Sequence, residues 1–390
     1  MEGDLIHIND WLRPLSWLYG VGVGFRNWLF DSEILKGKEF ERPVICVGNI
    51  TVGGTGKTPH TEMLIRMLQE QYRVAVLSRG YMRKTRGYLV ASTRTSMRDI
   101  GDEPWQIKQK FPDTIVAVDT NRRRGLTRLF TDEETRDVDI VLLDDAFQHR
   151  YVTPGVNILL VDYHRLVIYD TLLPAGRLRE PLTGKDRADI VIVTKCPKDL
   201  KPMEYRVITK AMKLYAYQSL YFTTLEYDDL QPVFGGDSRP LDSLQPQEHV
   251  LLLTGIASPE QIIHDLKPFT ENLTPLSFAD HHQFKKKDIQ LINETFAQLP
   301  EPRCIITTEK DTTRLYDVEG LSEEVRRHIY ALPVNIRFLL DQEETFNQYI
   351  IGYVRKNSRN SVLAKTKDDH KPNDSDYLRN RTRTISFRNN

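Results

Sequence analysis

Short runs of apolar residues, many of them β-branched, alternate with amphipathic stretches along most of the chain. From residue 44 the apolar runs are VICVGNI, VAVLS, TIVAV, DIVLLDD, NILLVD and DIVIVTK, and helical patterns such as TEMLIRMLQEQ and WQIKQKF separate the first of them. Continuous apolar runs are typical of strands buried on both faces, and strands that alternate with helices form parallel sheets. The pattern predicts an α/β fold whose core, residues 41–230, is a doubly wound, mainly parallel sheet.

A second, smaller α/β lobe is expected after this core. Residues 231–248 contain turn-forming sequence such as FGGD and are interpreted as a linker. The runs HVLLLTGI, LTPLSF, RCIITTEKD and IYALPVNI then alternate with helical patterns, which places the lobe at residues 249–355. Residues 356–390 hold nine Lys or Arg against four Asp and few apolar positions, so we expect a disordered basic tail.

Residues 11–30 form an unusually aromatic segment, which holds three of the four tryptophans. Its apolar stretch of 12 residues between two arginines is too short to span a bilayer. The segment fits an N-terminal helix docked on the core, and it also fits a helix in a membrane interface, where Trp and Tyr lie at headgroup level. Gly20, Gly22 and Gly24 weaken a continuous helix, so two short helices fit as well as one. At helical spacing one face carries Trp11, Leu15, Leu18, Phe25 and Leu29.

Composition narrows the class of protein. With 390 residues, 40% hydrophobic and 28% charged, the chain is long enough for several packed domains. The 54 Lys and Arg balance 54 Asp and Glu, so there is no global basic field of the kind that drives nucleic-acid binding. Three widely separated cysteines fit a reducing compartment and argue against a cysteine-based zinc site. The sequence has neither a membrane-spanning run nor a secretory signal, and we expect a cytoplasmic protein.

The segment VICVGNITVGGTGKTPHTEMLI carries the most specific chemistry. A buried strand leads into a glycine-rich turn, and a helix then opens with Pro59 in its first turn. Backbone N–H groups of such a turn surround phosphate oxygens, Lys57 reaches the β- and γ-phosphates, and Thr58 offers its hydroxyl to Mg²⁺. The strict G-x-x-x-x-G-K-[ST] pattern fails at Thr51, which stands where that pattern has glycine. The residues predicted to bind the nucleotide are Thr51, Val52, Gly53, Gly54, Thr55, Gly56, Lys57 and Thr58.

A second nucleotide-binding signal lies in DIVLLDDAFQH. Four apolar residues lead into Asp144 and Asp145 at the expected carboxyl end of a strand. Carboxylates at that edge hold Mg²⁺, directly or through water, beside the phosphates. An Asp pair that ends a strand is also common in ordinary turns, but a phosphate loop in the same sheet favours a metal site made with Thr58.

Several segments together resemble the tetraacyldisaccharide 4'-kinases, the lipid A pathway enzymes that phosphorylate a membrane-embedded glycolipid. The matching segments follow the family's order, and the family also has threonine at the position of Thr51. Ala146 departs from the family, which usually has glycine there. The matching segments are VGNITVGGTGKTP, LSRGY, GDEP, LLDDAFQH, LPAGRLREP, FADHH and TTEKD.

The resemblance implies a P-loop NTPase-like core, a smaller C-terminal lobe, a connecting β-ribbon and an active site in the cleft. It implies ATP and Mg²⁺ as cofactors, and a lipid A disaccharide 1-phosphate whose 4'-hydroxyl accepts the γ-phosphoryl group. It also implies that residues 1–40 form an amphipathic segment on the cytoplasmic face of the inner membrane, in a Gram-negative-type bacterium. We expect no nucleic-acid partner, and the oligomeric state is not predicted.

The same resemblance assigns roles to individual residues. By its local sequence alone, Asp102 of GDEP could simply cap the helix that follows. The resemblance implies instead that Asp102 is the catalytic base, acting beside Lys57 and assisted by His281 of FADHH, since an imidazole can orient a carboxylate and tune its proton affinity. His282 is the neighbouring candidate, and the sequence does not separate the two. The residues expected to contact the acceptor are Arg79, Tyr81, Glu103, Arg122, Gln148, His149, Arg179 and Glu180.

Other interpretations share part of this pattern. A P-loop GTPase or metallochaperone-like switch has the same loop and sheet, but guanine selection commonly uses Asn-Lys-x-Asp, and VTKCP has Pro197 in place of that Asp. A membrane adaptor that binds nucleotide without turnover would not need Asp102 or His281. The run of three arginines that begins at Arg122 also fits a solvated helix face. Taken together, the motifs favour a kinase.

Overall fold

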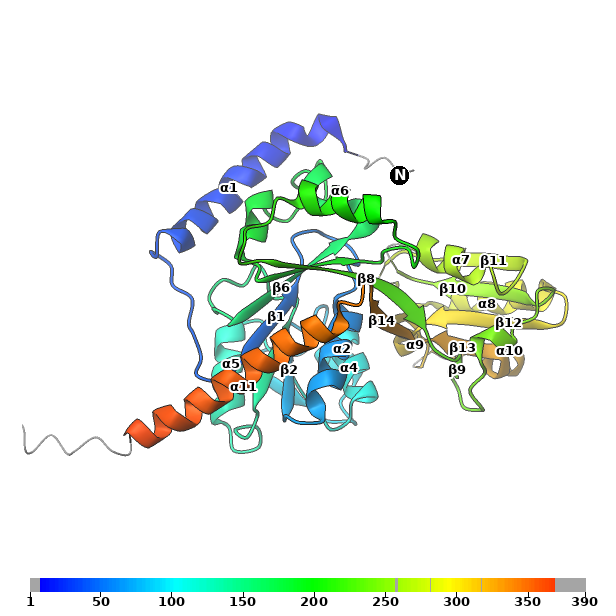
Figure 1. The fold of residues 1–390 in the computed structure, drawn as a ribbon. Helices are drawn as coiled ribbons and strands as arrows, with labels where there is room; N and C mark the ends of the chain where they lie inside the picture. Colours follow the sequence, from blue (N-terminus) through cyan, green and yellow to red (C-terminus); the bar gives the residue numbers. More distant parts are fainter. Residues whose placement is uncertain (1–7, 257–258, 281, 317, 369–390) are drawn as a thin grey trace, which may run out of the picture.

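The structure, a computed structural model, describes residues 8–256, 259–280, 282–316 and 318–368, which form two α/β lobes (Figure 1). The first lobe contains a nine-stranded sheet in the order β14-β8-β7-β6-β1-β5-β2-β4-β3. Its interior strands are parallel, and β14 and β3 pair antiparallel at the two edges. Every residue of β1, β2, β5 and β7 is buried, as expected for strands covered on both faces. The strands are β1 (Val44–Gly48), β2 (Val74–Ser78), β3 (Leu89–Ala91), β4 (Ile115–Val118), β5 (Ile140–Asp144), β6 (Val156–Asp162), β7 (Ile190–Thr194), β8 (Ser219–Tyr227) and β14 (Val334–Phe338).

Helices cover both faces of this sheet, so the predicted doubly wound α/β fold is confirmed. On one face, Leu64 of α2, Ile107 of α4 and Phe346 of α11 belong to one apolar cluster with the strands. On the other face, Leu126 of α5 and Ile208 of α6 belong to a second cluster. Since β1 lies in the middle of the sheet, the loop after it opens at the carboxyl edge, where α/β proteins bind ligands. The helices are α2 (Lys57–Gln69), α3 (Met97–Ile100), α4 (Asp102–Lys110), α5 (Arg122–Thr131), α6 (Pro202–Met212) and α11 (Glu343–Asp368).

The second lobe contains a five-stranded sheet in the order β11-β10-β12-β13-β9. Phe296 of α8 and Val325 of α10 pack in one apolar cluster, and Leu266 of α7 packs in another. α9 follows β12 directly and packs against α4 of the first lobe. The elements are β9 (Gln231–Pro232), β10 (His249–Thr254), α7 (Glu260–Leu266), β11 (Asn272–Ser277), α8 (Lys286–Gln298), β12 (Arg303–Thr308), α9 (Glu309–Leu315), α10 (Glu323–His328) and β13 (Ile329–Leu332).

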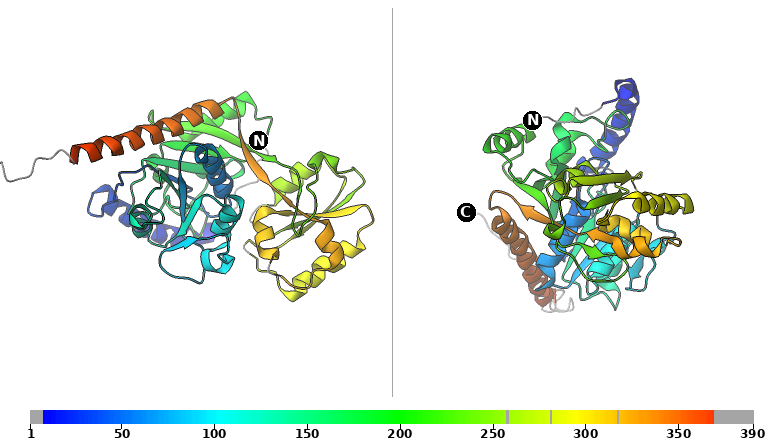
Figure 2. Two further views of the ribbon diagram at one scale, coloured as in Figure 1. Left: turned by 90° about the horizontal axis from the view of Figure 1, so that it is seen from below. Right: turned by 90° about the vertical axis from the view of Figure 1, so that its right-hand side faces the viewer.

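The chain crosses between the lobes twice, which differs from the predicted boundaries. β8 leads out of the first lobe and β14 returns antiparallel beside it, so these two strands form a ribbon that joins the lobes (Figure 2). The predicted linker 231–248 belongs to the second lobe, because β9 pairs with β13 and both Leu241 and Leu244 lie in that lobe's core. The IYALPVNI run is interrupted at Pro333, which has no N–H for a ladder hydrogen bond, and its two halves join different sheets.

The last helix, α11, corrects the expectation for the C-terminal part of the chain. It packs on the first lobe through Phe346 and Val354, whereas we assigned its beginning to the second lobe and its end to a disordered tail at 356–390. The chain is helical as far as Asp368 because these residues continue a helix that is already anchored on the sheet. Residues 369–390 of the predicted tail lie outside the described part of the chain.

The N-terminal helix α1 (Arg13–Asp31) is continuous, and its three glycines do not divide it into two helices. Small residues on its inner side permit a close approach to the first lobe. Ser16 Oγ accepts a hydrogen bond from the Ala175 amide at 2.9 Å, and a Cβ at Gly20 would lie only 2.7 Å from Leu172 Cδ1. The small residues of α1 therefore allow a close approach to the lobe, and Phe30 near the end of the helix is buried against it beside Tyr151.

Most of the large apolar side chains of α1 are exposed, whereas Phe30 is buried. Trp11, just before the helix, is 93% exposed, and a helix that used this face to dock on its own core would have buried it. In the described part of the chain, α1 included, we find no helix long and apolar enough to cross a bilayer. The exposed apolar residues of this segment are Trp11, Leu15, Trp17, Leu18, Val21, Phe25 and Trp28.

Candidate active site

The glycine-rich loop after β1 is held in shape by buried side chains. Asn49 Nδ2 donates to Thr55 Oγ1 at 2.8 Å, and Thr194 Oγ1, at the end of β7, donates to the Thr55 carbonyl at 3.1 Å. Gly56, with φ of 82°, precedes α2 in a left-handed conformation that favours glycine. The loop therefore keeps its shape through hydrogen bonds made entirely within the first lobe.

His60, in the first turn of α2, adds a further connection to the loop. Its Nδ1 lies 2.7 Å from the Gly56 carbonyl, which can only accept, so Nδ1 donates and Nε2 accepts from Thr223 Oγ1 at 3.1 Å. Burial lowers the pKa of His60 to about 4, so the imidazole is neutral at physiological pH. This histidine ties the loop to β8, and no signal in the sequence pointed to it.

Thr51 stands at the start of the loop, where the standard pattern has glycine. It forms an antiparallel bridge with Leu178, and the Val52 amide donates to the Arg177 carbonyl at 2.8 Å. The backbone at Thr51 does not enter the left-handed region, so a β-branched residue fits. The departure from the strict motif thus has a structural reason, since the loop begins as a short strand paired with residues 177–179.

A cleft of about 620 Å³ opens beside this loop and collects most of the predicted site residues. Ser78 of β2, three residues of α1 and two of the second lobe also line it, and the sequence did not predict these six. The predicted residues that line it are Val52, Gly53, Gly54, Lys57, Arg79, Tyr81, Glu103, Asp145, Gln148, Arg179 and Glu180. The predicted residues that do not line it are Thr51, Thr55, Gly56, Thr58, Asp102, Arg122, Asp144 and His149.

Asp144 and Asp145 lie at the carboxyl end of β5 and differ in environment. Asp144 is fully buried, its Oδ1 has no hydrogen-bond partner, and its Oδ2 lies 3.5 Å from Ser78 Oγ. Burial, together with the charges of Glu103 and Asp145, raises the pKa of Asp144 to about 7. An orphaned carboxylate oxygen beside two other acids fits a cation, and Mg²⁺ commonly takes only one or two protein carboxylates. Among the described residues, no group of three or more His, Cys, Asp or Glu side chains is placed to hold a metal ion.

Asp145 is held by cations on both sides. Lys57 Nζ lies 3.9 Å from Asp145 Oδ1, and Arg179 Nη1 lies 3.2 Å from the same oxygen. Burial alone would raise the pKa of Asp145, but Lys57 and Arg179 outweigh it, so its pKa lies below the usual value. Asp145 is therefore the charged member of the pair, and its ion pair positions Lys57 directly after the glycine-rich loop.

Asp102 is the first residue of α4, and its carboxylate is fixed by an arginine from the other lobe. Arg314 Nη2 of α9 lies 2.7 Å from Asp102 Oδ2. Arg314 is buried and is itself held by Asp311 Oδ1 at 3.0 Å and by the Gly255 carbonyl at 3.1 Å. Gly101 is the residue that precedes the helix, so Asp102 is not its N-cap. The TTEKD motif contains Asp311, but nothing in the sequence linked Arg314 to Asp102.

Further ion pairs join the lobes around Asp102. Lys310 Nζ lies 3.8 Å from Glu103 Oε1 and 3.5 Å from Asp280 Oδ1. Lys110 Nζ, at the end of α4, bridges Glu62 and Glu309 at 2.7 and 2.6 Å. The interface between α4 and α9 is therefore largely ionic.

The FADHH motif contains both histidine candidates for the partner of Asp102. His281 lies outside the described residues. His282, the neighbouring candidate, directs Nε2 to Asp288 Oδ2 at 2.9 Å and stacks on Phe278. The structure therefore places His282 at the start of α8.

The residues expected to contact the acceptor divide into two groups. Arg179, Gln148 and Glu180 line the cleft, and Gln148 Nε2 donates to Glu180 Oε1 at 2.9 Å. Arg122 is instead buried behind Asp144, whose carbonyl oxygen accepts from Arg122 Nη2 at 3.2 Å. Arg122 therefore does not lie on a solvent-exposed helix face. Its buried side chain is hydrogen-bonded to the backbone at the carboxyl end of β5.

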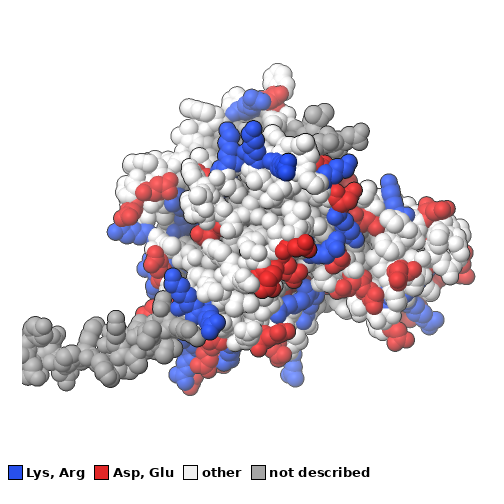
Figure 3. Space-filling model, viewed as in Figure 1, with Lys and Arg blue, Asp and Glu red and all other residues white. Residues whose placement is uncertain are grey.

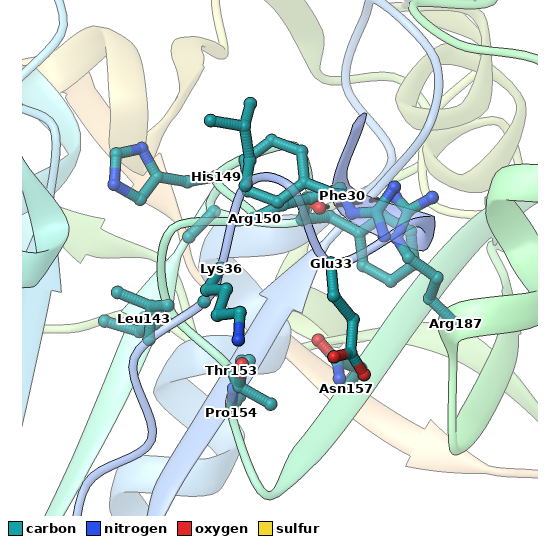
Figure 4. A pocket seen from close by; sticks show the side chains of 15 residues that line it. Phe30, Glu33, Lys36, Leu143, His149, Arg150, Thr153, Pro154, Asn157 and Arg187 are labelled. Carbon is teal, nitrogen blue, oxygen red and sulfur yellow. Dashed lines mark hydrogen bonds between the residues drawn. The ribbon is translucent and has the colours of Figure 1, made fainter. Parts of the chain in front are cut away.

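His149 lines a different cavity, on the other side of the loop that follows β5 (Figure 4). This cavity of about 440 Å³ lies where the chain after α1 passes over the ends of β5 and β6. Phe30 and Arg150 line it beside His149, and His149 is the one predicted site residue on its wall. Burial, with the nearby cations Arg122 and Arg26, lowers the pKa of His149 to about 4.

α1 is bonded to the acceptor side of the cleft. Tyr19 Oη donates to the Arg179 carbonyl at 2.7 Å, and Arg26 Nη2 donates to the Gln148 carbonyl at 2.8 Å. Tyr19, Val23 and Arg26 also form part of the cleft wall. One side of α1 therefore contributes to the site while the opposite side exposes apolar residues.

Known proteins resemble this chain over nearly its whole length. Residues 8–355 match the family model for tetraacyldisaccharide-1-P 4'-kinase. The chain is 58% identical over 366 residues to the tetraacyldisaccharide 4'-kinase of Phocaeicola vulgatus, with 93% of this chain and 100% of that protein covered. It is 54% identical over 376 residues to the protein of the same name from Bacteroides fragilis, with 95% and 100% covered.

A solved structure gives the same result. The crystal structure of LpxK from Aquifex aeolicus in complex with ATP superposes with a TM-score of 0.68 at 28% sequence identity. The superposition covers 89% of this chain and 99% of that one. From the family match, the close relatives and the shared fold, we conclude that this chain belongs to the tetraacyldisaccharide-1-P 4'-kinase family.

Proposed function

We propose that the protein transfers the γ-phosphoryl group of ATP to the 4'-hydroxyl of a tetraacyldisaccharide 1-phosphate, a step of lipid A biosynthesis. The observation that carries the proposal is the cleft itself. It combines the phosphate-binding loop and Lys57 with Asp145 at the end of β5, cations from both lobes and the inner side of α1, and Asp144 lies buried next to Asp145. The names of the close relatives and the ATP bound to the Aquifex protein support the same reaction.

The nucleotide end of the cleft neutralises phosphate charge. The amides of residues 53–56 and the start of α2 surround the β-phosphate, and Lys57 reaches the β- and γ-oxygens. Asp144 and the Thr58 hydroxyl would hold Mg²⁺, and the ion would neutralise charge that develops on the phosphates. Asp145 keeps Lys57 oriented through the ion pair at 3.9 Å. Phosphoryl transfer needs this charge neutralisation and in-line positioning more than covalent help.

The other end of the cleft positions the acceptor. Asp102 takes the proton of the attacking 4'-hydroxyl, and Arg314 fixes the carboxylate so that one oxygen keeps a constant direction. His281 assists Asp102 in this proposal. Arg79 and Arg179 supply guanidinium groups that bind phosphate oxygens in pairs.

The outward face of α1 rests in the membrane interface, which brings the lipid acceptor to the cleft. A helix with exposed Trp and Phe on one side and polar contacts to the protein on the other has the features of an interfacial helix. Because Tyr19 and Arg26 of the same helix line the cleft, a glycolipid held at the interface lies beside the acceptor end.

Incubation with labelled ATP and a lipid A disaccharide 1-phosphate tests the proposed reaction. We expect label on the distal sugar, dependent on both Mg²⁺ and the acceptor. ATP hydrolysis without transfer to a detergent-solubilised acceptor would contradict the proposal and would favour a nucleotide-dependent switch.

A separate measurement tests the membrane contact. The double variant Trp17→Ser/Phe25→Ser changes two exposed side chains of α1 and should move the protein from the membrane to the soluble fraction of a cell lysate. The matched control is Tyr316→Ser, which also removes an exposed aromatic ring but lies in the second lobe. Retention of the double variant on membranes would show that α1 is not the anchor.

A further inference from the structure

A second surface of the molecule combines exposed cations with exposed apolar side chains. It comprises the outward side chains of residues 198–217, which include α6 and the turn after it, and we call it the α6 face. Between residues 198 and 213 there are five exposed Lys or Arg and two acidic residues. The cations used in the argument are Lys201, Arg206, Lys210 and Lys213.

The cations of the α6 face are available for a ligand. Within the described part of the chain, none of the five is in an ion pair. Figure 3 shows the basic side chains gathered over α6, with few acidic ones among them. Since surface cations usually lie among carboxylates, a cluster of unpaired ones indicates an anionic partner.

Apolar side chains accompany these cations. Met203 is 69% exposed on α6, and Tyr215 and Tyr217 are more than half exposed just after it. The two tyrosine rings stack with their centroids 5.6 Å apart. Tyrosine beside Lys and Arg is typical of side chains that lie at the headgroup level of a bilayer.

The α6 face is fixed in position by the first lobe. Ile208 and Met212, on the inner side of α6, are buried in the core. Tyr205 packs on Phe222 of β8 with ring centroids 4.9 Å apart. The face is therefore part of a rigid element, so a partner would meet it in one orientation.

The α6 face lies on the same side of the molecule as α1. In Figure 1 and in the right-hand view of Figure 2, which differ by a rotation about the vertical axis, both helices lie along the top. A flat partner that touches the apolar side of α1 is thereby close to the α6 face as well. A bilayer surface is such a partner, and its phosphate groups complement the charge.

We infer that the α6 face is a second membrane contact, which binds anionic phosphate headgroups while α1 inserts its apolar side chains. The inference rests on the membrane contact of α1 proposed above. Contact through α1 alone leaves the protein free to rock about the axis of that helix. Contact at α1 and at the α6 face together fixes the tilt of the first lobe, and with it the direction in which the cleft opens toward the bilayer.

Vesicle sedimentation of the full-length protein tests the inference. The probes are vesicles of phosphatidylcholine alone and vesicles with phosphatidylglycerol added, each at low and at high salt. The variant is Arg206→Gln/Lys210→Gln/Lys213→Gln. The matched control, Arg94→Gln/Arg123→Gln/Arg327→Gln, removes three exposed arginines from other parts of the surface, so the two variants have equal net charge.

The wild type should partition more strongly onto the anionic vesicles, and high salt should abolish the difference. Each Lys or Arg next to a strongly anionic surface increases the partition coefficient onto it about fivefold. The partition coefficient of the α6 variant should therefore fall roughly 100-fold on anionic vesicles and change little on neutral ones. The control variant should lose much less. Equal losses in the two variants, or a wild type indifferent to phosphatidylglycerol, would overturn the inference.

The α1 variant Trp17→Ser/Phe25→Ser separates this inference from the proposed function. Its binding should fall on neutral and anionic vesicles alike, because insertion of apolar side chains does not depend on headgroup charge. If the α1 variant binds like the wild type, the proposed anchor is wrong. If the α1 variant fails to bind while the α6 variant keeps the full anionic preference, α1 is the anchor and the α6 face is not a membrane contact.

Discussion

The two ends of the cleft are built in different ways. At the nucleotide end, Asn49, Thr194 and His60 hold the loop from within one lobe. At the transfer end, Asp102 is held by Arg314, which lies 212 residues away in the sequence and in the other lobe. The nucleotide end is therefore formed by the first lobe alone, whereas the transfer end is complete only where the two lobes meet. Variants at the two ends should fail in different kinetic parameters.

The largest expected effect is at the transfer end. Asp102→Asn keeps the size of the side chain but removes the base, so kcat should fall by about 10³-fold or more. Affinity for ATP should stay within about twofold of the wild type, because Asp102 is held by Arg314 at the contact between the lobes. Steady-state kinetics and ATP titration measure the two quantities.

Asp99→Asn is the matched control, since Asp99 lies three residues earlier in the short helix α3, whereas Asp102 begins α4 and is held by Arg314. Its kcat should equal that of the wild type. A normal kcat in Asp102→Asn would remove the base assignment.

A smaller effect is expected when the link between the lobes is weakened. Arg314→Lys keeps one charge, but a single ammonium group cannot serve Asp311, the Gly255 carbonyl and Asp102 together. We expect kcat to fall by about 10- to 100-fold, which corresponds to the usual free-energy contribution of one hydrogen bond to a charged group. Affinity for ATP should change little. The exposed Arg327→Lys of α10 serves as control. Weakened ATP binding with an unchanged kcat would show that Arg314 serves the nucleotide end instead.

This difference between the ends also explains what the sequence could predict. The glycine-rich loop with its lysine and the acidic pair at the end of β5 are contiguous motifs, and the buried strands can be recognised as apolar runs. The contact between Asp102 and Arg314 joins two lobes, and no local pattern marks an arginine as the partner of a distant carboxylate. His60 was missed for a similar reason, because a histidine in the first turn of a helix reveals nothing about the strand behind it.

Periodicity also has limits that the helices and strands of this chain illustrate. It identified which residues of α1 share a face but not that this face points outward, because the small residues that dock the helix are inconspicuous. It identified IYALPVNI as strand material, but the division at Pro333 between two sheets depends on how the lobes are connected. The helical continuation of α11 past residue 356 could not be read from polar sequence either, since its anchor lies further back at Phe346.

At the nucleotide end, loss of a loop contact should change binding rather than turnover. Asn49→Ala removes the buried hydrogen bond to Thr55 Oγ1, so part of the binding energy must then order the loop. We expect the Kd for ATP to rise about tenfold, which corresponds to roughly 1.4 kcal/mol, with kcat at saturating ATP within about twofold of the wild type. Thr194→Val, which removes the hydrogen bond to the Thr55 carbonyl, should raise the Kd for ATP in the same way and leave kcat nearly unchanged. If either variant instead lowers kcat at saturating ATP, the loop also contributes to the transfer step.

The smallest expected effect distinguishes the two carboxylates at the end of β5. The pKa of Asp144 rises to about 7 in the folded protein, so the native state keeps a proton that the unfolded chain releases near pH 4, and the contribution of Asp144 to stability falls as the pH rises from about 4 to 7. The effect of pH on the contribution of Asp145 to stability has the opposite sign, because its pKa is lowered and its contribution is present above the unfolded pKa.

In the absence of Mg²⁺ at pH 8, Asp144→Asn should therefore raise Tm by about 3–5 °C, and Asp145→Asn should lower it. Thermal unfolding at pH 5 and pH 8 checks both signs, and the gain in Asp144→Asn should be clearly smaller at pH 5 than at pH 8. Addition of Mg²⁺ and ATP should stabilise the wild type more than Asp144→Asn, since the amide cannot replace a carboxylate as a ligand. Equal stabilisation of both proteins would place the metal on other residues.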